Sequence, residues 1–226
     1  MSVILYDLAG ADRSVRFSPF CWIAKFALLH KGIDFETEAL GFLPKSDYPD
    51  PEYGKLPMLA IDGTLVRDSG AIVEWLEDKH PQSPLATDSA KVERVKEIAM
   101  GGLMGLMFGL SILHIVNAIA PEDKDYFRTS REERFGMSLE DIAANPDARA
   151  NLESALAKLE SELGSNSWFG GQSPDLADYY VASILMWRHS VTQKKEYDVP
   201  ASIAAWFERM KGHFNGYAAA APTAAA

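Results

Sequence analysis

A run of 23 residues without a formal charge, Ile98 to Ala120, limits the possible folds of this chain more than any other stretch. As a helix it is long enough to cross a bilayer. Its flanks, "KVERVKE" before and "PEDKD" after, carry charges of both signs, so no positive-inside asymmetry marks an orientation. No belt of Trp or Tyr marks either edge. We therefore expect a helix buried inside a soluble helical domain, and no membrane partner.

The first eighty residues have a different pattern, in which short apolar runs alternate with helix signals. Strands are predicted at 3–8, 35–40, 58–62 and 64–68, with Asp62-Gly63 as a tight turn between the last two. A helix is predicted over 18–32, where Ser18 is the N-cap, Pro19 is the first helical residue and Gly32 follows the end. A second helix follows at 69–80. The order β-α-β-β-β-α predicts a small α/β layer.

The rest of the chain is predicted to be helical. A Pro- and Ser-rich linker is predicted at 82–89, between an α/β domain over 1–81 and an all-α domain over 90–226. The predicted helices lie at about 88–120, 121–136, 146–163, 175–189 and 201–213. The alanine-rich tail, "YAAAAPTAAA", is expected to fray.

Charge and cysteine content exclude several classes of function. A net charge of −10 disfavours nucleic acid and anionic membrane surfaces. The single cysteine, Cys21, cannot form an internal disulfide, which is typical of a reducing compartment, so a cytoplasmic location is expected. The five histidines show no metal-ligand spacing, so no metal site is expected.

The motif Ser18-Pro19-Phe20-Cys21 has the form of a C-x-x-C redox motif whose first cysteine is replaced by serine. Three interpretations stay open at this point: an inactive redox site, an ordinary helix start, or a site that acts on the thiol of another molecule. With "KLPML" before the third strand, "DSGAI" opening the next helix and an all-helical second half, the chain resembles the glutathione transferases. "LYDL", "DYFRTSREERFGMSLEDI" and "WFGGQSPDLADYYVASILMW" are similar to the bacterial lignin β-aryl etherases and the fungal etherase-related (FuA) class.

The resemblance implies a thioredoxin-like N-terminal domain that binds glutathione, a helical domain that binds an apolar aromatic co-substrate, and a homodimer. It implies that Ser18 donates a hydrogen bond to the glutathione thiolate. Lowering a thiol pKa by about two units takes roughly 2.7 kcal/mol. A hydroxyl bonded to a charged group supplies about 1.5–3 kcal/mol, and a helix N-terminus adds about 0.3–1 kcal/mol, so the sum is sufficient. A plain N-cap remains the alternative for this serine.

Other glutathione contacts follow from the same resemblance. Asp68 is expected to bind the γ-glutamyl ammonium, and Ser69 with the helix N-terminal amides its carboxylate. A cis bond before Pro57 would turn the Leu56 backbone toward the cysteinyl group. For the glycyl carboxylate, two lysines are candidates, Lys45 and Lys55.

The apolar co-substrate is expected to contact side chains of the helical domain. The candidates on the uncharged run share one helical face, and two more lie further along the chain: Met100, Met104, Met107, Phe108, Tyr180 and Trp187. Core packing is the alternative for each of them. In "SPDLADYY", Asp175 and Asp178 are predicted to form a capping box.

The expected function is attack by a Ser18-stabilised glutathione thiolate on an apolar aromatic electrophile, with cleavage of a β-aryl ether or plain conjugation as the reaction. A different class of function is a non-catalytic, glutathione-dependent carrier of hydrophobic aromatic ligands. A third possibility is glutaredoxin-like reduction through Cys21.

Overall fold

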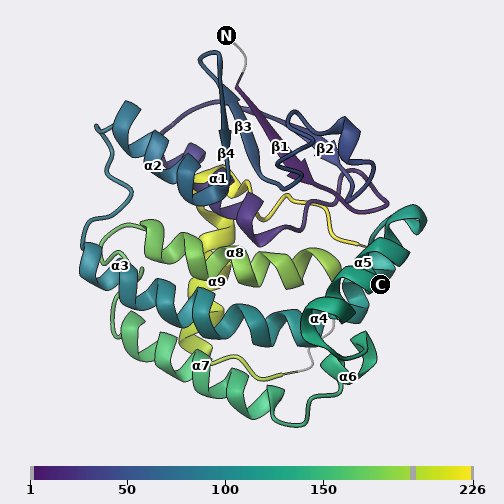
Figure 1. The fold of residues 1–226 in the computed structure, drawn as a ribbon. Coiled ribbons are helices and arrows are strands. Elements are labelled where there is room, and N and C mark those ends of the chain that lie inside the picture. Colours follow the sequence, from purple (N-terminus) through teal and green to yellow (C-terminus); the bar gives the residue numbers. More distant parts are fainter. Residues whose placement is uncertain (1–2, 194–196, 225–226) are drawn as a thin grey trace.

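The computed structural model describes residues 3–193 and 197–224, which form a sheet domain above a larger helical domain (Figure 1). The elements of the sheet domain follow one another as β1 (Ile4–Leu8), α1 (Pro19–His30), β2 (Glu36–Leu40), a short 3-10 helix η1 (Lys45–Asp47), β3 (Met58–Ile61), β4 (Thr64–Arg67) and α2 (Ser69–Lys79). This order confirms the predicted β-α-β-β-β-α pattern and adds η1.

The sheet has the strand order β2-β1-β3-β4, in which β1 and β2 are parallel and the other pairs antiparallel. Leu8 lies opposite Leu40, and Tyr6 lies opposite Met58. The ends of β1 and β2 therefore meet the start of β3 at one edge of the sheet. The segments expected to bind glutathione leave the sheet at this edge.

The two faces of the sheet pack against different layers, as the alternation of side chains along a strand requires. Leu5 and Leu59 point into the main core, which they share with α1, α2 and the helical domain. On the opposite face, Met58 packs with Leu40 and Tyr48, the latter from the loop after β2. This loop covers the outer face of the sheet.

Helices make up the second domain. Their bounds are α3 (Ser89–Lys96), a π-helical segment η2 (Glu97–Leu103), α4 (Met104–Ala118), α5 (Pro121–Phe135), α6 (Leu139–Ala143), α7 (Ala148–Leu163), α8 (Leu176–Val191) and α9 (Ala201–Gly216). The predicted helices are confirmed, but α6 was missed. With five residues it is too short to produce a periodic apolar pattern.

The uncharged run belongs to one continuous helix, Ser89–Ala118, made of α3, η2 and α4. Among the described residues this is one helix whose length and composition would allow it to cross a membrane. In this fold it packs against α7 and α8, and Leu103 and Met107 are fully buried. Its opposite side keeps apolar residues such as Leu113 partly exposed.

The structure confirms the predicted hairpin turn, the glycine after α1 and the capping box of α8. Asp62 and Gly63 both have positive φ, as a tight hairpin turn requires, and Gly32 follows α1 in the left-handed region. At the start of α8, Asp175 and Asp178 form the predicted capping box, with both reciprocal bonds present. The linker residues between α2 and α3 form neither helix nor strand, but Leu85 is fully buried.

The expectation that the tail frays is wrong for the described residues up to 224. The last turns of α9 are kinked at Phe214 and Asn215, both with positive φ, and the chain that follows runs between the two domains (Figure 1). The ring of Tyr217 lies 6.2 Å from that of Trp22 in α1, and the N–H of Ala224 donates to the carbonyl of Ser190 at 2.7 Å. The tail is ordered by these contacts with distant residues, which its own composition does not reveal.

Candidate functional site

Ser18 is the N-cap of α1, as predicted. Its backbone is extended, and its Oγ accepts a hydrogen bond from the N–H of Cys21 at 3.4 Å. The side chain is buried. A hydroxyl accepts through its lone pairs and donates through its proton, so accepting this bond leaves the proton of Ser18 available to a bound anion. The capping role and a role toward glutathione are therefore compatible.

The loop between β1 and α1 brings Ser18 back to the edge of the sheet. Ala9 and Arg16 form an antiparallel bridge, so the loop leaves and returns at the end of β1. The indole Nε1 of Trp22 donates to the carbonyl of Arg16 at 3.1 Å and fixes the first turn of α1 to this loop. The N-terminus of α1 thus faces the edge where β3 begins.

The start of β3 carries the predicted cis bond, between Leu56 and Pro57. The carbonyl of Pro57 accepts from the N–H of Asp68 at 3.1 Å, which joins the proline loop to the start of α2. Leu56 is half-buried and Pro57 is buried. The predicted glutathione-binding segments at Pro57 and at Asp68 are therefore in direct contact.

Asp68 is the N-cap of α2 and has a φ of 76°. Positive φ is uncommon for residues other than glycine and is concentrated at functional sites. Its carboxylate Oδ1 accepts from the N–H of Gly70 at 2.7 Å and remains exposed, whereas Ser69 is buried. Burial, with smaller contributions from nearby carboxylates that include Asp68, raises the pKa of Tyr180 to about 12.

The two candidate lysines occupy different surroundings. Lys45 is half-buried: its Nζ donates to the hydroxyl of Tyr48 at 3.2 Å and lies over the rings of Tyr48 and Tyr126, 4.4 and 5.6 Å from their centroids. Burial and the charge of Arg131 lower the pKa of Lys45. Lys55 is exposed, 5.9 Å from the ring of Tyr53. Lys45 is thus the lysine with a defined position.

The six co-substrate candidates do not lie together. Phe108 of α4 is stacked between Phe135 and Trp187, with centroid distances of 5.4 and 5.6 Å. Trp187 shares an apolar cluster with Phe17, the neighbour of Ser18 in the sequence. This cluster therefore extends from the helical domain to the catalytic candidate.

The other candidates belong mainly to the core. Met107 is completely buried, Met100 and Met104 are partly buried, and Tyr180 lies in the main core. Two cavities of about 400 and 550 Å³ are lined by other residues, among them Arg13 and Tyr48 for the first and Arg188 for the second. The co-substrate pocket stays a prediction.

A buried ion pair beneath the first turns of α1 was not expected from the sequence. The Nζ of Lys25 lies 2.5 Å from Oδ2 of Asp7, and both side chains are almost completely buried. Cys21 is also buried, and burial, together with the negative charge of Asp7, raises the pKa of its thiol. The sequence contained one signal for this ion pair: Asp7 is a charged residue in an apolar predicted strand, and Lys25 is a charged residue on the apolar face of a predicted helix.

Metal ligands do not gather in the part of the chain that the structure describes: no group of three or more His, Cys, Asp or Glu side chains lies in a position to hold an ion.

A four-stranded α/β domain with a cis-proline before an inner strand, followed by a helical domain, defines a protein with a thioredoxin-like fold and an appended helical domain. Two family models match this division: residues 14–84 match the glutathione S-transferase N-terminal domain, and residues 93–217 match the glutathione S-transferase C-terminal domain. The chain therefore belongs to the glutathione S-transferase family.

Individual relatives agree with this assignment. The chain is 25% identical over 198 residues to the glutathione S-transferase GstA of Escherichia coli O157:H7, with 84% of this chain and 88% of the relative covered. Among solved structures, it is similar in fold to the glutathione transferase GSTFuA3 from Phanerochaete chrysosporium, with a TM-score of 0.80, 22% identity and coverage of 96% and 97%. It is also similar to a glutathione S-transferase of Ceriporiopsis subvermispora in complex with glutathione, with a TM-score of 0.76, 20% identity and coverage of 96% and 98%.

Proposed function

We propose that this protein is a glutathione transferase in which Ser18 stabilises the glutathione thiolate for attack on apolar aromatic electrophiles, with β-aryl ethers as the first substrates to test. The observation that carries the proposal is the position of Ser18. It caps α1 after a loop that returns to the end of β1, and β1 pairs with β3, whose first residues are bonded to the start of α2. The family assignment and the glutathione complex of a related fold support glutathione as the co-substrate.

Each part of glutathione has a proposed partner. The Ser18 hydroxyl donates to the sulfur, and the N-terminus of α1 adds a favourable dipole. Asp68 and Ser69 bind the γ-glutamyl end, the Leu56 backbone binds the cysteinyl amide and carbonyl, and Lys45 binds the glycyl carboxylate. The exposed carboxylate of Asp68 and the half-buried ammonium of Lys45 support these assignments.

The proposed reaction is a substitution at carbon. The thiol gives its proton to solvent, the thiolate forms a C–S bond to the carbon that carries the ether oxygen, and the C–O bond breaks. The phenolate then leaves and takes a proton from water. The aromatic cluster that joins Phe108 and Trp187 to Phe17, the neighbour of Ser18 in the sequence, supports an aromatic substrate.

The test is incubation with glutathione and a β-aryl ether model compound that carries a fluorescent phenol. Release of the phenol that requires glutathione identifies an etherase. Saturable binding of the ether without product identifies the alternative, a glutathione-dependent carrier. Loss of turnover in Cys21→Ser would instead indicate redox chemistry at the cysteine, which its complete burial argues against.

We also propose a homodimer in the cytoplasm. Apolar side chains that a single chain leaves partly exposed on α4 and α5, including Leu113, Tyr126 and Phe135, support an association surface. Analytical ultracentrifugation tests the dimer, because a monomer at micromolar concentration would contradict it.

The proposed cytoplasmic location is supported by the unpaired Cys21, which is typical of a reducing compartment.

A further inference from the structure

A buried carboxylate of the helical domain, that of Asp123, holds the backbone of the sheet domain. Asp123 lies in the first turn of α5 and is completely buried. Its Oδ2 accepts from the N–H of Phe42 at 3.0 Å, and its Oδ1 accepts from the N–H of Leu43 at 2.8 Å. Both oxygens thus bind consecutive peptide groups of the loop that follows β2. A bond to an ionised acceptor is stronger than one between neutral groups, so this contact fixes the loop firmly.

The loop leaves space for the carboxylate of Asp123 because residue 41 is a glycine. At Gly41, a Cβ would lie 2.9 Å from Oδ2 of Asp123 and 3.0 Å from Nη1 of Arg13, too close for any other residue without a shift. At the far end of the loop, the hydroxyl of Tyr48 donates to the carbonyl of Gly41 at 2.8 Å. The segment from 41 to 48 is therefore closed upon itself and anchored to α5.

Lys45 lies inside this closed loop. Its ammonium is bonded to Tyr48 and also lies over the ring of Tyr126, which is on α5, three residues after Asp123. Arg131, five residues after Tyr126 on α5, lies over the ring of Phe42 at 5.1 Å. Helix α5 therefore holds the backbone of the loop through Asp123 and contacts the Lys45 ammonium group through Tyr126.

We propose that Asp123 is a positioning residue for glutathione, which holds the loop 41–48 so that Lys45 meets the glycyl carboxylate. This inference rests on the proposed function and deepens it, because it makes recognition of the tripeptide depend on the helical domain. Asp123 itself contacts no ligand. Asp123 is expected to increase the affinity for the glycyl end of glutathione specifically, so it should not affect the affinity for a ligand that lacks the glycine.

The experiment compares the affinities of glutathione and γ-glutamylcysteine, which lacks the glycyl residue, by calorimetry. The wild type is expected to prefer glutathione by about tenfold, the value of one charge-assisted contact. Lys45→Ala and Asp123→Asn are each expected to remove this preference, and the double variant is expected to be no weaker than either single variant. In Asp123→Asn without ligand, amide hydrogen exchange at Phe42 and Leu43 is expected to accelerate.

Two further variants separate positioning from general loss of stability. Gly41→Ala disturbs the same contact from the loop side, and is expected to reduce the preference as Asp123→Asn does. Asp175→Asn changes another buried carboxylate that bonds backbone N–H groups, at the start of α8, and is expected to leave the preference unchanged.

Three outcomes would overturn the inference, and they differ in what else they affect. A wild type that binds both ligands equally refutes the role of Lys45 and Asp123 but leaves a glutathione site in place. A wild type that binds neither refutes the proposed function as well. An Asp123→Asn protein with faster exchange at Phe42 and Leu43 but an unchanged preference shows that Asp123 is only a structural anchor.

Discussion

At the scale of single residues, a serine at position 18, where a C-x-x-C motif has a cysteine, determines what the start of α1 can do. A cysteine pair would allow a redox cycle within the protein, whereas Ser18 provides a hydroxyl that caps the helix and retains a proton to donate. The remaining Cys21 is buried beside Asp7 and Lys25, and its raised pKa keeps the thiol neutral. A neutral, inaccessible thiol is a poor nucleophile, which supports the proposal that the reactive sulfur belongs to glutathione.

Ser18→Ala is expected to raise the pKa of bound glutathione and to slow turnover at neutral pH by about tenfold or more, because a hydroxyl bond to a charged group is worth about 1.5–3 kcal/mol. The measurement is the pH dependence of kcat/KM, in which the rise with pH moves to higher values. Ser18→Thr keeps both the cap and the hydroxyl, and is expected to retain the wild-type profile. An unchanged profile in Ser18→Ala would reject the role.

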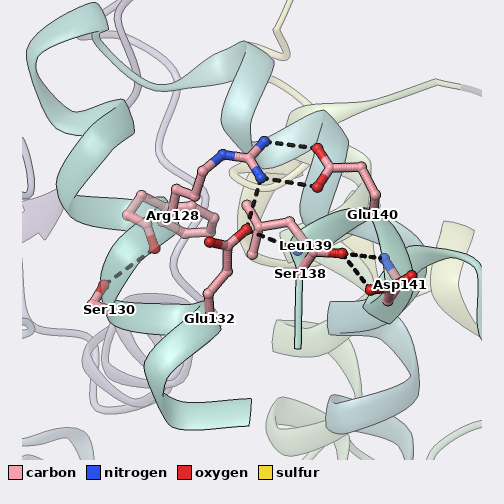
Figure 2. A network of polar contacts seen from close by, with 8 residues as sticks. Arg128, Ser130, Glu132, Ser138, Leu139, Glu140 and Asp141 are labelled. Carbon is pink, nitrogen blue, oxygen red and sulfur yellow. Dashed lines mark hydrogen bonds and ion pairs between the residues drawn. The ribbon is translucent and has the colours of Figure 1, made fainter. Parts of the chain in front are cut away.

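At the scale of elements, polar side chains decide where helices begin and how they are held. The carboxylate of Asp178 accepts four hydrogen bonds: from the N–H groups of Phe169, Gly170 and Asp175, and from the indole of Trp206. It thereby joins the start of α8 to the preceding loop and to α9. The α5–α6 hairpin is fixed in another way, by Arg128, which bonds Glu132 and both oxygens of Glu140 (Figure 2).

Asp178→Ala is expected to lower the free energy of unfolding by about 3 kcal/mol or more, because it leaves buried N–H donors without an acceptor. Chemical denaturation measures the loss. Asp88→Asn is the control, since Asp88 is an exposed N-cap that accepts one bond, from the N–H of Lys91, and Asn caps a helix about as well as Asp, so a small effect is expected. If Asp178→Ala unfolded at the wild-type denaturant concentration, the four bonds would be shown to contribute little.

The Arg128–Glu140 pair is expected to give the protein an acid-dependent contribution to stability. The bonds from Arg128 lower the pKa of Glu140 from 4.5 to about 2. A carboxylate with a lowered pKa in the folded state stabilises the fold above its unfolded pKa and loses this contribution as the pH falls toward the folded value. The contribution is therefore full above about pH 4.5 and is lost between that pH and about 2.

Comparison of Tm values for the wild type and Glu140→Gln from pH 2 to 7 measures this contribution. The wild type is expected to melt slightly higher above pH 5, because the pair is exposed to solvent, and the difference is expected to vanish near pH 2. A difference in Tm that stayed constant over the whole range would contradict the assignment to this ion pair.

At the scale of the whole molecule, the sheet domain and the helical domain contact each other at several separate places. Helix α1 packs against α8, the tail after α9 returns to α1, and Asp123 of α5 binds the loop after β2. The predicted glutathione site lies on the sheet domain, but its loop and its aromatic surroundings are supplied or held by helices. We therefore expect the two domains to depend on one another for function.

Tyr217→Ala is expected to destabilise the protein by about 2 kcal/mol, since it removes an aromatic ring packed against Trp22 and Phe35. Thermal denaturation measures the change. Burial raises the pKa of Tyr217 to about 12, so its hydroxyl is neutral, and Tyr217→Phe is expected to retain near wild-type stability. Equal losses in the two variants would show that the hydroxyl, and not the packed ring, is responsible.

The sequence by itself was sufficient for the order of the strands and the longer helices, because strand and helix periodicity, caps and turn residues act over a few neighbouring positions. It located Ser18 at a helix start, the hairpin at Asp62-Gly63, and the capping box at Asp175. The family resemblance added the cis bond before Pro57, which residue propensities alone make improbable. Local patterns could not reveal α6, which is too short, or the ordered tail.

Only the tertiary structure decided which of these residues meet. It separated Lys45 from Lys55, placed Met107 in the core and Phe108 against Trp187, and brought Asp123 to the backbone of a loop eighty residues earlier in the chain. The physical reason is that burial and long-range hydrogen bonds depend on which surfaces pack together, and the spacing of residues along the chain does not contain that information.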